Sequence, residues 1–440
     1  MTKRYLGNII TQNPTAPTGN SGANYGVATG VWSLSEARTF SAAGDWPIPA
    51  SAPGAPTIGT ATAGDTIATV AFTANADDGG LDVTSFTATS NPGSITGSAS
   101  SSPVTVTGLT NGTAYTFTVT ATNGAGTSAA SAASNSVTPA LPQRGVFMGG
   151  RSSNSSTAQI NVIQYIEIPT TGNASDFGDL TAARSENSGA GSSTRALSAG
   201  GDNTSGQYVK NIDYFAMPST GNASDFGDLA VNMVMGAGAS NGTRALFADG
   251  VGTGPYDTIN YVTIASTGNA TDYGDFTSTY TFAGLASTTR ALFGGGIDSS
   301  YENSIRYYTI SSTGNGTDFG DLTIARYDIS GLSSATRGVF CGGRQTGNSV
   351  SNVMDYVTIA SAGNATDFGD FANGDQRESC ASTSSSTRGV IAGGTGNVGT
   401  QPNNRIDYIT IASTGNSSDF GDLNNVASQA AATSNCHGGL

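Results

Sequence analysis

An internal repeat fills the sequence from residue 142 to its end. A ten-residue element, [Thr/Ala]-Gly-Asn-x-[Ser/Thr]-Asp-[Phe/Tyr]-Gly-Asp-[Leu/Phe], occurs six times, and its first glycines are 46–52 residues apart. Each unit also has an Arg-[Ala/Gly]-[Leu/Val] element, often followed by Gly-Gly, and a β-rich run around a tyrosine. The glycines are Gly172, Gly221, Gly268, Gly314, Gly363 and Gly415; the arginines are Arg144, Arg195, Arg244, Arg290, Arg337 and Arg388; the tyrosines are Tyr165, Tyr214, Tyr261, Tyr307, Tyr356 and Tyr408. One such unit cannot bury its apolar face alone, so neighbouring units must pack together.

The number and length of the units predict an architecture. Six units of nearly 50 residues, each with about four segments of strand length, are typical of the blades of a β-propeller. The order of segments resembles the kelch repeat: a strand that ends in Gly-Gly, a tyrosine strand, an outer strand with an aromatic residue, and a strand of small residues. Phe177 and Tyr273 stand where kelch blades often carry Trp, and Asp249-Gly250 replaces Gly-Gly in the third unit. The resemblance implies a six-bladed kelch-like β-propeller over residues 141–440.

The last strand of the chain is expected to close this propeller. Asn435 lies 47 residues after Arg388, in register with the Thr-Arg of the other units. A strand is therefore expected over residues 429–435. The first unit begins at Arg144 and lacks a preceding strand of small residues, so the last strand should complete the first blade. Closure of this kind removes exposed strand edges.

Residues 51–140 carry a different β pattern. Short runs that alternate apolar and polar residues between turns are typical of a β-sandwich; they lie at residues 69–73, 84–88, 104–106 and 115–119. Leu109 lies six residues before Tyr115, and this segment resembles the tyrosine corner of fibronectin type III domains. The resemblance implies a phenol that bonds back to the backbone. A core Trp is lacking, and Phe72 is expected in its place.

Composition excludes several partners. The formal net charge is −14, the pI is about 4.3, and only two lysines occur. Without a basic stripe to follow phosphates, we expect no nucleic-acid partner and no anionic membrane partner. No run of 18 apolar residues occurs, and no signal peptide is expected. The scarcity of Lys and Glu argues against surface helices, so an all-β chain is expected.

The sequence shows no recognisable catalytic arrangement. His437 is the only histidine and the three cysteines are far apart, so neither a Ser-His-Asp triad nor a zinc site is expected. A retaining glycosidase needs paired carboxylates or a Tyr–Glu pair, and the glutamates share no repeated context. We expect no enzymatic activity, no cofactor and no metal. Calcium held by the repeated aspartates is the alternative, although turn formation explains these residues without a metal.

The repeated polar residues have structural interpretations. The six arginines are expected to form ion pairs with the repeated aspartates of neighbouring blades; a substrate-binding arginine cluster is the alternative. Each Asn-x-[Ser/Thr] of the repeat is a glycosylation sequon, and we interpret it as turn chemistry. Gly-Gly is expected to permit close backbone approach near a central channel.

The loops that follow the Gly-Gly positions differ in length and sequence. Loops on a rigid scaffold commonly carry function, and their Asn, Ser, Gly and Tyr suit polar surfaces and sugars. We expect these loops to gather on one face; insertions without function are the alternative. The candidate receptor-binding residues are Asn154, Tyr208, Tyr256, Tyr301, Asn348 and Asn403.

The whole arrangement resembles virion proteins of tailed bacteriophages, which often carry an attachment segment, an immunoglobulin-like or fibronectin type III spacer and a distal repeat domain. The similarity rests on the segment around Trp32 and Leu34, on the acidic composition rich in Gly, Ser, Thr and Asn, and on the near-identical repeats. It implies that residues 1–50, a short irregular segment, dock onto other tail or baseplate proteins through Trp32, Leu34 and Trp46. Residues 51–140 would then be a spacer.

The expected function follows from this resemblance. The chain is expected to be a non-enzymatic structural protein of the virion exterior, such as a tail fibre, present in several copies. Its propeller would bind a bacterial surface glycan or protein. The alternatives are a virion decoration protein without a receptor role and a bacterial surface or secreted adhesin.

Overall fold

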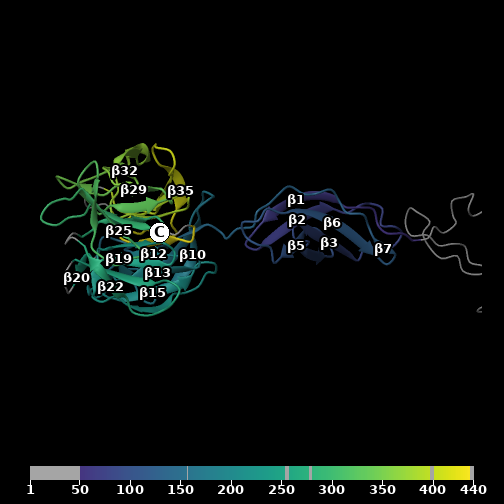
Figure 1. The fold of residues 1–440 in the computed structure, drawn as a ribbon, viewed down its shortest axis with the longest axis horizontal. Helices are drawn as coiled ribbons and strands as arrows, with labels where there is room; N and C mark the ends of the chain where they lie inside the picture. The colour runs from purple at the N-terminus through teal and green to yellow at the C-terminus, as the bar shows by residue number, and fades with distance from the viewer. Residues whose placement is uncertain (1–49, 156, 253–256, 277–279, 397–400, 437–440) are drawn as a thin grey trace, which may run out of the picture. The chain divides into compact units, whose positions relative to one another are not determined.

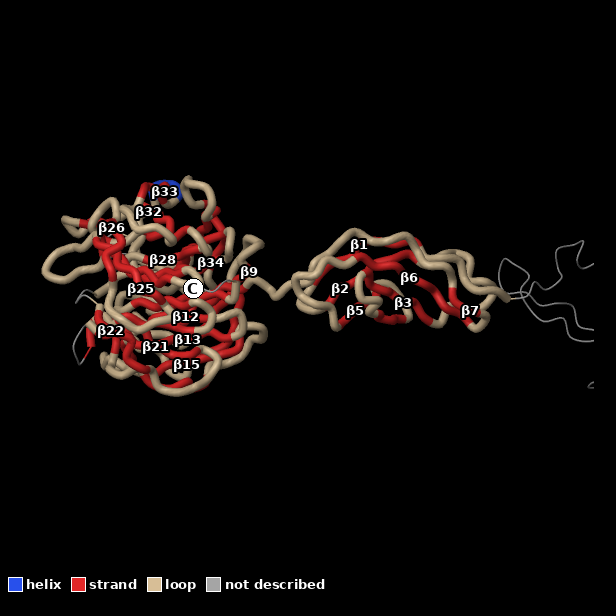
Figure 2. The backbone as a smooth tube through the Cα atoms, viewed as in Figure 1, coloured by secondary structure: helices blue, strands red, loops and turns tan. Residues whose placement is uncertain are grey.

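Strands form nearly all the regular structure of this protein. The computed structural model describes residues 50–155, 157–252, 257–276, 280–396 and 401–436. These residues belong to two compact units, which meet in sequence between Pro142 and Gln143, and strands run through both (Figures 1 and 2). The single helical element in the described part is η1 (Ala372–Gly374), so the all-β prediction is confirmed. Within the same ranges, no helix is long and apolar enough to cross a membrane.

Four of the predicted site residues lie outside this description. Trp32, Leu34 and Trp46 of the predicted attachment segment are among them, and so is the loop candidate Tyr256.

The first unit is a sandwich of two antiparallel sheets, with strand orders β1-β2-β5 and β4-β3-β6-β7. Every second side chain of β2, β3 and β6 faces the core. The four predicted runs correspond to β2, β3, β5 and β6, and the structure adds three strands. The bounds are β1 (Thr57–Ala63), β2 (Ile67–Thr73), β3 (Ser85–Asn91), β4 (Thr96–Ala99), β5 (Val104–Thr107), β6 (Thr116–Asn123) and β7 (Gly126–Thr127).

The sandwich has a tyrosine corner at Tyr115, the position predicted from the sequence. The Tyr115 hydroxyl accepts a hydrogen bond from the backbone N–H of Thr110 at 3.1 Å, and Leu109 is buried in the same core. Phe72 packs against Phe86 with 4.6 Å between ring centres. These two rings occupy the core that lacks a tryptophan.

The second unit consists of six four-stranded antiparallel sheets. In each sheet the strand of small residues comes first, followed by the arginine strand, the tyrosine strand and the strand of the Asp-[Phe/Tyr]-Gly-Asp element. In sheet order, the strands are β38 (Ala431–Ser434), β8 (Arg144–Met148), β9 (Val162–Glu167), β10 (Ser175–Asp179); β12 (Ser188–Gly191), β13 (Arg195–Ala199), β15 (Asn211–Ala216), β16 (Ser224–Asp228); β18 (Ala237–Ser240), β19 (Arg244–Ala248), β21 (Thr258–Thr263), β22 (Thr271–Asp275); β23 (Ala283–Ala286), β24 (Arg290–Gly294), β25 (Ser304–Thr309), β26 (Thr317–Asp321); β28 (Ser330–Ser333), β29 (Arg337–Cys341), β32 (Val353–Thr358), β33 (Thr366–Asp370); and β34 (Ala381–Ser384), β35 (Arg388–Ala392), β36 (Arg405–Thr410), β37 (Ser418–Asp422).

Short ribbons flank three of these sheets. They pair the residues before a small-residue strand with the loop after Gly-Gly. Their strands are β11 (Arg184–Ser185) with β14 (Asp202–Asn203), β17 (Met233–Val234) with β20 (Val251–Gly252), and β27 (Arg326–Tyr327) with β30 (Arg344–Gln345) and β31 (Ser349–Val350).

The innermost strands follow one another in a closed cycle. Strand β12 contacts β18, and the contacts continue through β23, β28, β34 and β38 back to β12. Strand β38, near the end of the chain, pairs with β8 and supplies the innermost strand of the first sheet, with Ala431 opposite Met148. We call these six sheets the ring.

Small side chains allow the innermost strands to touch. A Cβ atom on Gly238 would lie only 2.1 Å from the carbonyl oxygen of Gly189, so no larger residue fits there. Serine hydroxyls link the same strands: Ser384 Oγ donates to the carbonyl of Ser333, and Ser434 Oγ donates to that of Ser384, both at 2.6 Å.

The six repeated arginines connect neighbouring sheets through backbone carbonyls. Arg195 Nη1 donates to the carbonyl of Ile264 in the next sheet at 2.8 Å, and its guanidinium lies 4.5 Å from the ring centre of Tyr214 in its own sheet. Arg388 Nη1 donates to the carbonyl of Ile168 at 2.9 Å, which joins the sixth sheet to the first. The equivalent bonds are made by Arg144, Arg244, Arg290 and Arg337.

The prediction that these arginines pair with the repeated aspartates is therefore wrong. Among the described residues, Arg144 alone of the six has an acidic partner, and that partner is Glu167. The first aspartate of each Asp-[Phe/Tyr]-Gly-Asp strand is exposed, as at Asp176. The arginine side chain instead lies against its tyrosine and ends at a carbonyl that the strand ladder leaves available.

The asparagine of the ten-residue element makes a second connection between sheets. Asn222 Oδ1 accepts a hydrogen bond from the backbone N–H of Asp179 in the preceding sheet at 3.1 Å. Asn173 does the same for Asp422 at 3.0 Å, again joining the sixth sheet to the first. The asparagine side chain of each sequon thus stabilises the contact between sheets.

Candidate functional site

The variable loops lie at the same end of the ring as the start of the innermost strands. Ser188, the first residue of β12, is opposite Ala199, which immediately precedes Gly200-Gly201. The other sheets repeat this antiparallel register. Residues just before an innermost strand are therefore neighbours of the Gly-Gly turns and of the loops that follow them.

A circle of six residues forms this end, and we call it the mouth. Their backbones make a closed cycle of hydrogen bonds, in which each N–H donates to the carbonyl of the equivalent residue in the preceding sheet at 2.7–3.2 Å. All six have positive φ, between 53° and 57°. The residues are Glu186, Met235, Thr281, Asp328, Ser379 and Gln429.

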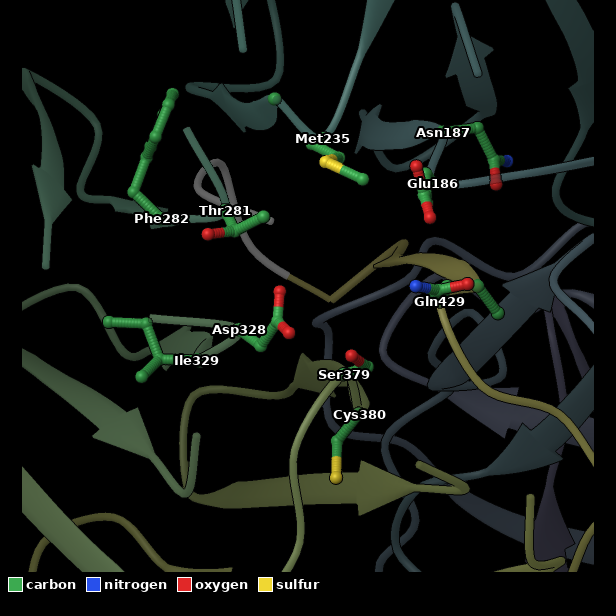
Figure 3. Close-up of a pocket in the computed structure, with 12 residues that line it drawn as sticks. Glu186, Asn187, Met235, Thr281, Phe282, Asp328, Ile329, Ser379, Cys380 and Gln429 are labelled. Carbon is green, nitrogen blue, oxygen red and sulfur yellow. The ribbon is translucent and has the colours of Figure 1, made fainter. Parts of the chain in front are cut away.

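The mouth conformation is unfavourable for the residues that occupy it. Left-handed backbone costs a non-glycine residue roughly 1–3 kcal/mol, and a β-branched residue such as Thr281 is least suited to it. The repeat uses glycine freely elsewhere but at none of these six positions. It places six different side chains there, and Figure 3 shows them around a pocket at the centre of the ring.

A larger cavity lies beside the mouth, with a volume of about 290 Å³. Three separate sheets contribute to its wall, because the loops of the first, fifth and sixth units meet there. The polar and aromatic lining residues that matter below are Arg151, Asn154, Tyr327, Asp328, Arg344 and Glu378.

The charged residues of this site are paired, with one exception. Arg344 forms a two-bond ion pair with Glu378, in which Nε lies 2.6 Å from Oε2. Arg151 lies 3.4 Å from Glu186 and 3.0 Å from Asp202. The Asp328 carboxylate makes no ion pair with any cation in the described ranges. Burial, together with the nearby Glu378 and Glu186, raises the pKa of Asp328 to about 7.

Two tyrosines support the edge of the cavity. Tyr301 and Tyr327 stack with 5.2 Å between ring centres and 6° between planes, and the Arg344 guanidinium lies 5.9 Å from the Tyr327 ring centre. The Tyr301 hydroxyl donates to Asn348 Oδ1 at 3.1 Å. The aromatic wall is thus fixed from both the fourth and the fifth units.

The structure separates the predicted loop residues into different settings. Asn154 lines the cavity, and Tyr301 and Asn348 are brought together behind its aromatic wall. Asn403 uses its amide within its own loop, through bonds to Gly394 and Arg405. Tyr208 has 38% of its surface exposed and is not among the lining residues.

Sequence analysis missed the residues that form most of this site. Tyr327, Asp328 and Glu378 belong to the segments before the innermost strands, whereas only the loops after Gly-Gly were considered. The mouth position differs in every unit, but the residues directly before and after it vary as well, so the sequence does not mark it out.

Within the described residues, no cluster of three or more His, Cys, Asp or Glu side chains is arranged to hold a metal ion.

Comparison with known proteins identifies one part of the chain. Residues 51–137 match the fibronectin type III domain, so this part of the prediction is confirmed. No curated protein matches the chain.

Proposed function

We propose that this chain is a non-enzymatic structural protein of a tailed-phage virion, in a tail fibre or a similar appendage. In this proposal, residues 141–440 are a six-bladed kelch-like β-propeller, and the mouth and its adjacent cavity bind the surface of the host bacterium. The fibronectin type III domain serves as a spacer. Residues 1–50 attach the chain to other tail or baseplate proteins through Trp32, Leu34 and Trp46.

The observation that carries the proposal is the contrast between constant and variable positions on one scaffold. The arginine and asparagine contacts between sheets recur around the ring. At the mouth, six positions share one backbone geometry but carry six different side chains. A fixed frame with a variable surface is the arrangement expected of a recognition module.

The polar lining of the cavity suits a bacterial surface glycan. Its wall combines amide, hydroxyl, carboxylate and guanidinium groups with the ring of Tyr327. A single small sugar site binds weakly, but many copies on one particle would amplify that affinity through effective concentration.

The test uses the full-length chain with a fluorescent label. It is incubated with a panel of bacterial strains, and saturable binding is measured together with competition by polysaccharide purified from the bound strain. We expect saturable, competed binding to few strains. We also expect loss of this binding in a Tyr327→Leu, Asp328→Asn variant.

The matched control is Asp419→Asn, because Asp419 is exposed on the outer strand β37, away from the mouth. Binding that is unaffected by the cavity variant would locate the receptor contact elsewhere. Absence of binding to every strain, including the host of the particle that carries the chain, would refute the receptor role and leave a decoration protein.

A further inference from the structure

We propose that the cavity beside the mouth binds a sugar residue that carries a free ammonium group, with the Asp328 carboxylate as its ion-pair partner. This inference rests on the proposed function and names the chemistry of the ligand at the same site.

Both arginines of the site are already paired with carboxylates other than Asp328. Arg344 is occupied by Glu378, which holds its guanidinium through two bonds. Arg151 is occupied by Glu186 and Asp202. These pairings leave no described cation to compensate Asp328, so a bound ligand can supply the missing positive charge.

The surroundings of the Asp328 carboxylate favour a positively charged ligand. Asp328 is partly buried, and Glu378 and Glu186 lie near enough to disfavour its ionised form, while Arg344 opposes them. The local potential is therefore negative despite two arginines in the neighbourhood. An ammonium group would be stabilised there by three carboxylates, and an anionic ligand would be repelled.

Asp328 differs in charge pairing from the equivalent residues around the mouth. Glu186, the only other acidic residue of the circle, is paired with Arg151. The remaining positions are neutral. The uncompensated charge therefore belongs to one sheet of six, and it occurs where the 290 Å³ cavity opens.

The size and the polar lining of the cavity fit a single sugar residue. Its volume of about 290 Å³ is at the lower end of the roughly 300–1,000 Å³ typical of ligand pockets, so it suits one small unit of a larger polymer. Asn154, Thr395 and Ser428 give the wall a polar lining; the Thr395 hydroxyl donates to Glu378 Oε1 at 3.3 Å. Tyr327, held by Tyr301, offers a rigid apolar edge for the C–H groups of a sugar.

The experiment measures the binding of three methyl glycosides to the full-length chain by titration calorimetry at pH 7.5. The ligands are methyl glucosaminide, methyl N-acetylglucosaminide and methyl glucoside, which differ only at one substituent. We expect the free amine to bind at least about tenfold more tightly than the other two, the effect of one charge-assisted hydrogen bond. Its binding should weaken at pH 5.5, where Asp328 is protonated.

Two substitutions make the test specific. Asp328→Asn keeps the shape and tolerates left-handed backbone, and it should abolish the preference for the amine. Asp419→Asn makes the same chemical change on an exposed outer strand and should leave the preference intact. Near-ultraviolet circular dichroism confirms that each variant keeps its tertiary packing.

Three results would overturn the inference: equal binding of the three glycosides, a preference that survives Asp328→Asn, or tight binding of Ca²⁺ alone that depends on Asp328. The cell-binding assay is run in parallel to separate the two proposals. Cell binding without an amine preference refutes this inference and leaves the receptor role standing. An amine preference that depends on Asp328, without binding to any cell, supports this inference and refutes the receptor role.

Discussion

Two sets of residues recur six times around the ring and differ in what is kept constant. One is the mouth, and the other consists of the repeated arginines with the backbone carbonyls that they bind, which we call the rim. At the rim, identical residues make identical contacts, as Arg195 and Arg388 do with the carbonyls of their neighbouring sheets. At the mouth, the backbone geometry is constant, but the side chains range from Met235 to Asp328. Closure of the ring requires the same residue to make the same contact between each pair of neighbouring sheets. Variation on a fixed and unfavourable geometry points to a requirement other than folding.

Variation alone does not separate function from stability, because some varying positions are deeply buried. The residue before the repeated tyrosine is Asp355 in the fifth sheet and Asn260 in the third. Asp355 pairs with Arg326 at 2.5 Å, and both side chains are fully buried. In the third sheet, Met233 occupies the position equivalent to Arg326. The protein thus has an ion pair at these two positions in one sheet and two neutral residues at the equivalent positions in another.

The largest predicted effect comes from breaking this buried ion pair. Arg326→Met alone leaves a buried carboxylate without its partner and should lower the free energy of unfolding by about 3–5 kcal/mol. The double variant Arg326→Met, Asp355→Asn reproduces the residues of the third sheet and should be within about 1 kcal/mol of the unchanged protein. Urea unfolding followed by fluorescence measures both. A double variant as unstable as the single one would show that the two sheets are not interchangeable.

The next largest effect is expected from substituting Asp249, which departs from the repeat. The change in the free energy of unfolding should depend on pH. Asp249 replaces a glycine of Gly-Gly and is 0% exposed; burial raises the pKa of Asp249 to about 7, with a further contribution from Asp257. A carboxyl group with a raised pKa in the folded state favours folding while protonated, so its stabilising effect is lost as the pH rises from about 4 to about 7. Asp249→Asn should therefore stabilise the protein at pH 8, by at most roughly 4 kcal/mol.

Urea unfolding at pH 4, 6 and 8 tests this expectation. The difference in stability between Asp249→Asn and the unchanged protein should be near zero at pH 4 and should grow up to pH 8. A difference that does not change with pH would show that Asp249 is ionised at its ordinary pKa despite its burial.

Single arginine contacts at the rim should each contribute less, and equally. Arg195→Ala removes a charged hydrogen bond of 2.8 Å and the contact with Tyr214, for an expected loss of about 1–3 kcal/mol. Arg244→Ala and Arg337→Ala make the same deletion elsewhere in the ring and should cost the same within about 0.5 kcal/mol. Thermal unfolding of the three variants side by side provides the comparison. Widely different losses would contradict the view that the rim is a set of equivalent contacts.

The sequence predicted the parts of this molecule that depend on repetition and local pattern. Six units, the order of their strands and the pairing of the last strand with the arginine strand of the first unit all follow from spacing. The tyrosine corner of the first unit follows from Leu109 and Tyr115. In each case the information is local, or recurs often enough to be recognised without coordinates.

The partners of the arginines and the location of the cavity could not be predicted in this way. A backbone carbonyl accepts a hydrogen bond whatever its side chain, so Ile264 leaves no trace as the acceptor for Arg195. Left-handed backbone is normally indicated by glycine, and the mouth uses none. The cavity joins Asn154 of the first unit to Tyr327 of the fifth, which are neighbours only because the ring closes.

The smallest predicted effect comes from Thr281. It tests whether the side chains of the mouth lower the stability of the protein. Thr281→Gly removes the left-handed strain of a β-branched residue, roughly 1–3 kcal/mol, against an entropic cost for glycine of about 0.5–1 kcal/mol. A net gain of about 1 kcal/mol is expected in thermal unfolding. Asp328→Gly should change stability much less, because aspartate tolerates this conformation better. If Thr281→Gly is destabilising instead, its side chain contributes to folding and the contrast between mouth and rim fails. A gain in stability would mean that glycine suits this mouth position better than the threonine that occupies it. A requirement other than stability would then account for the threonine.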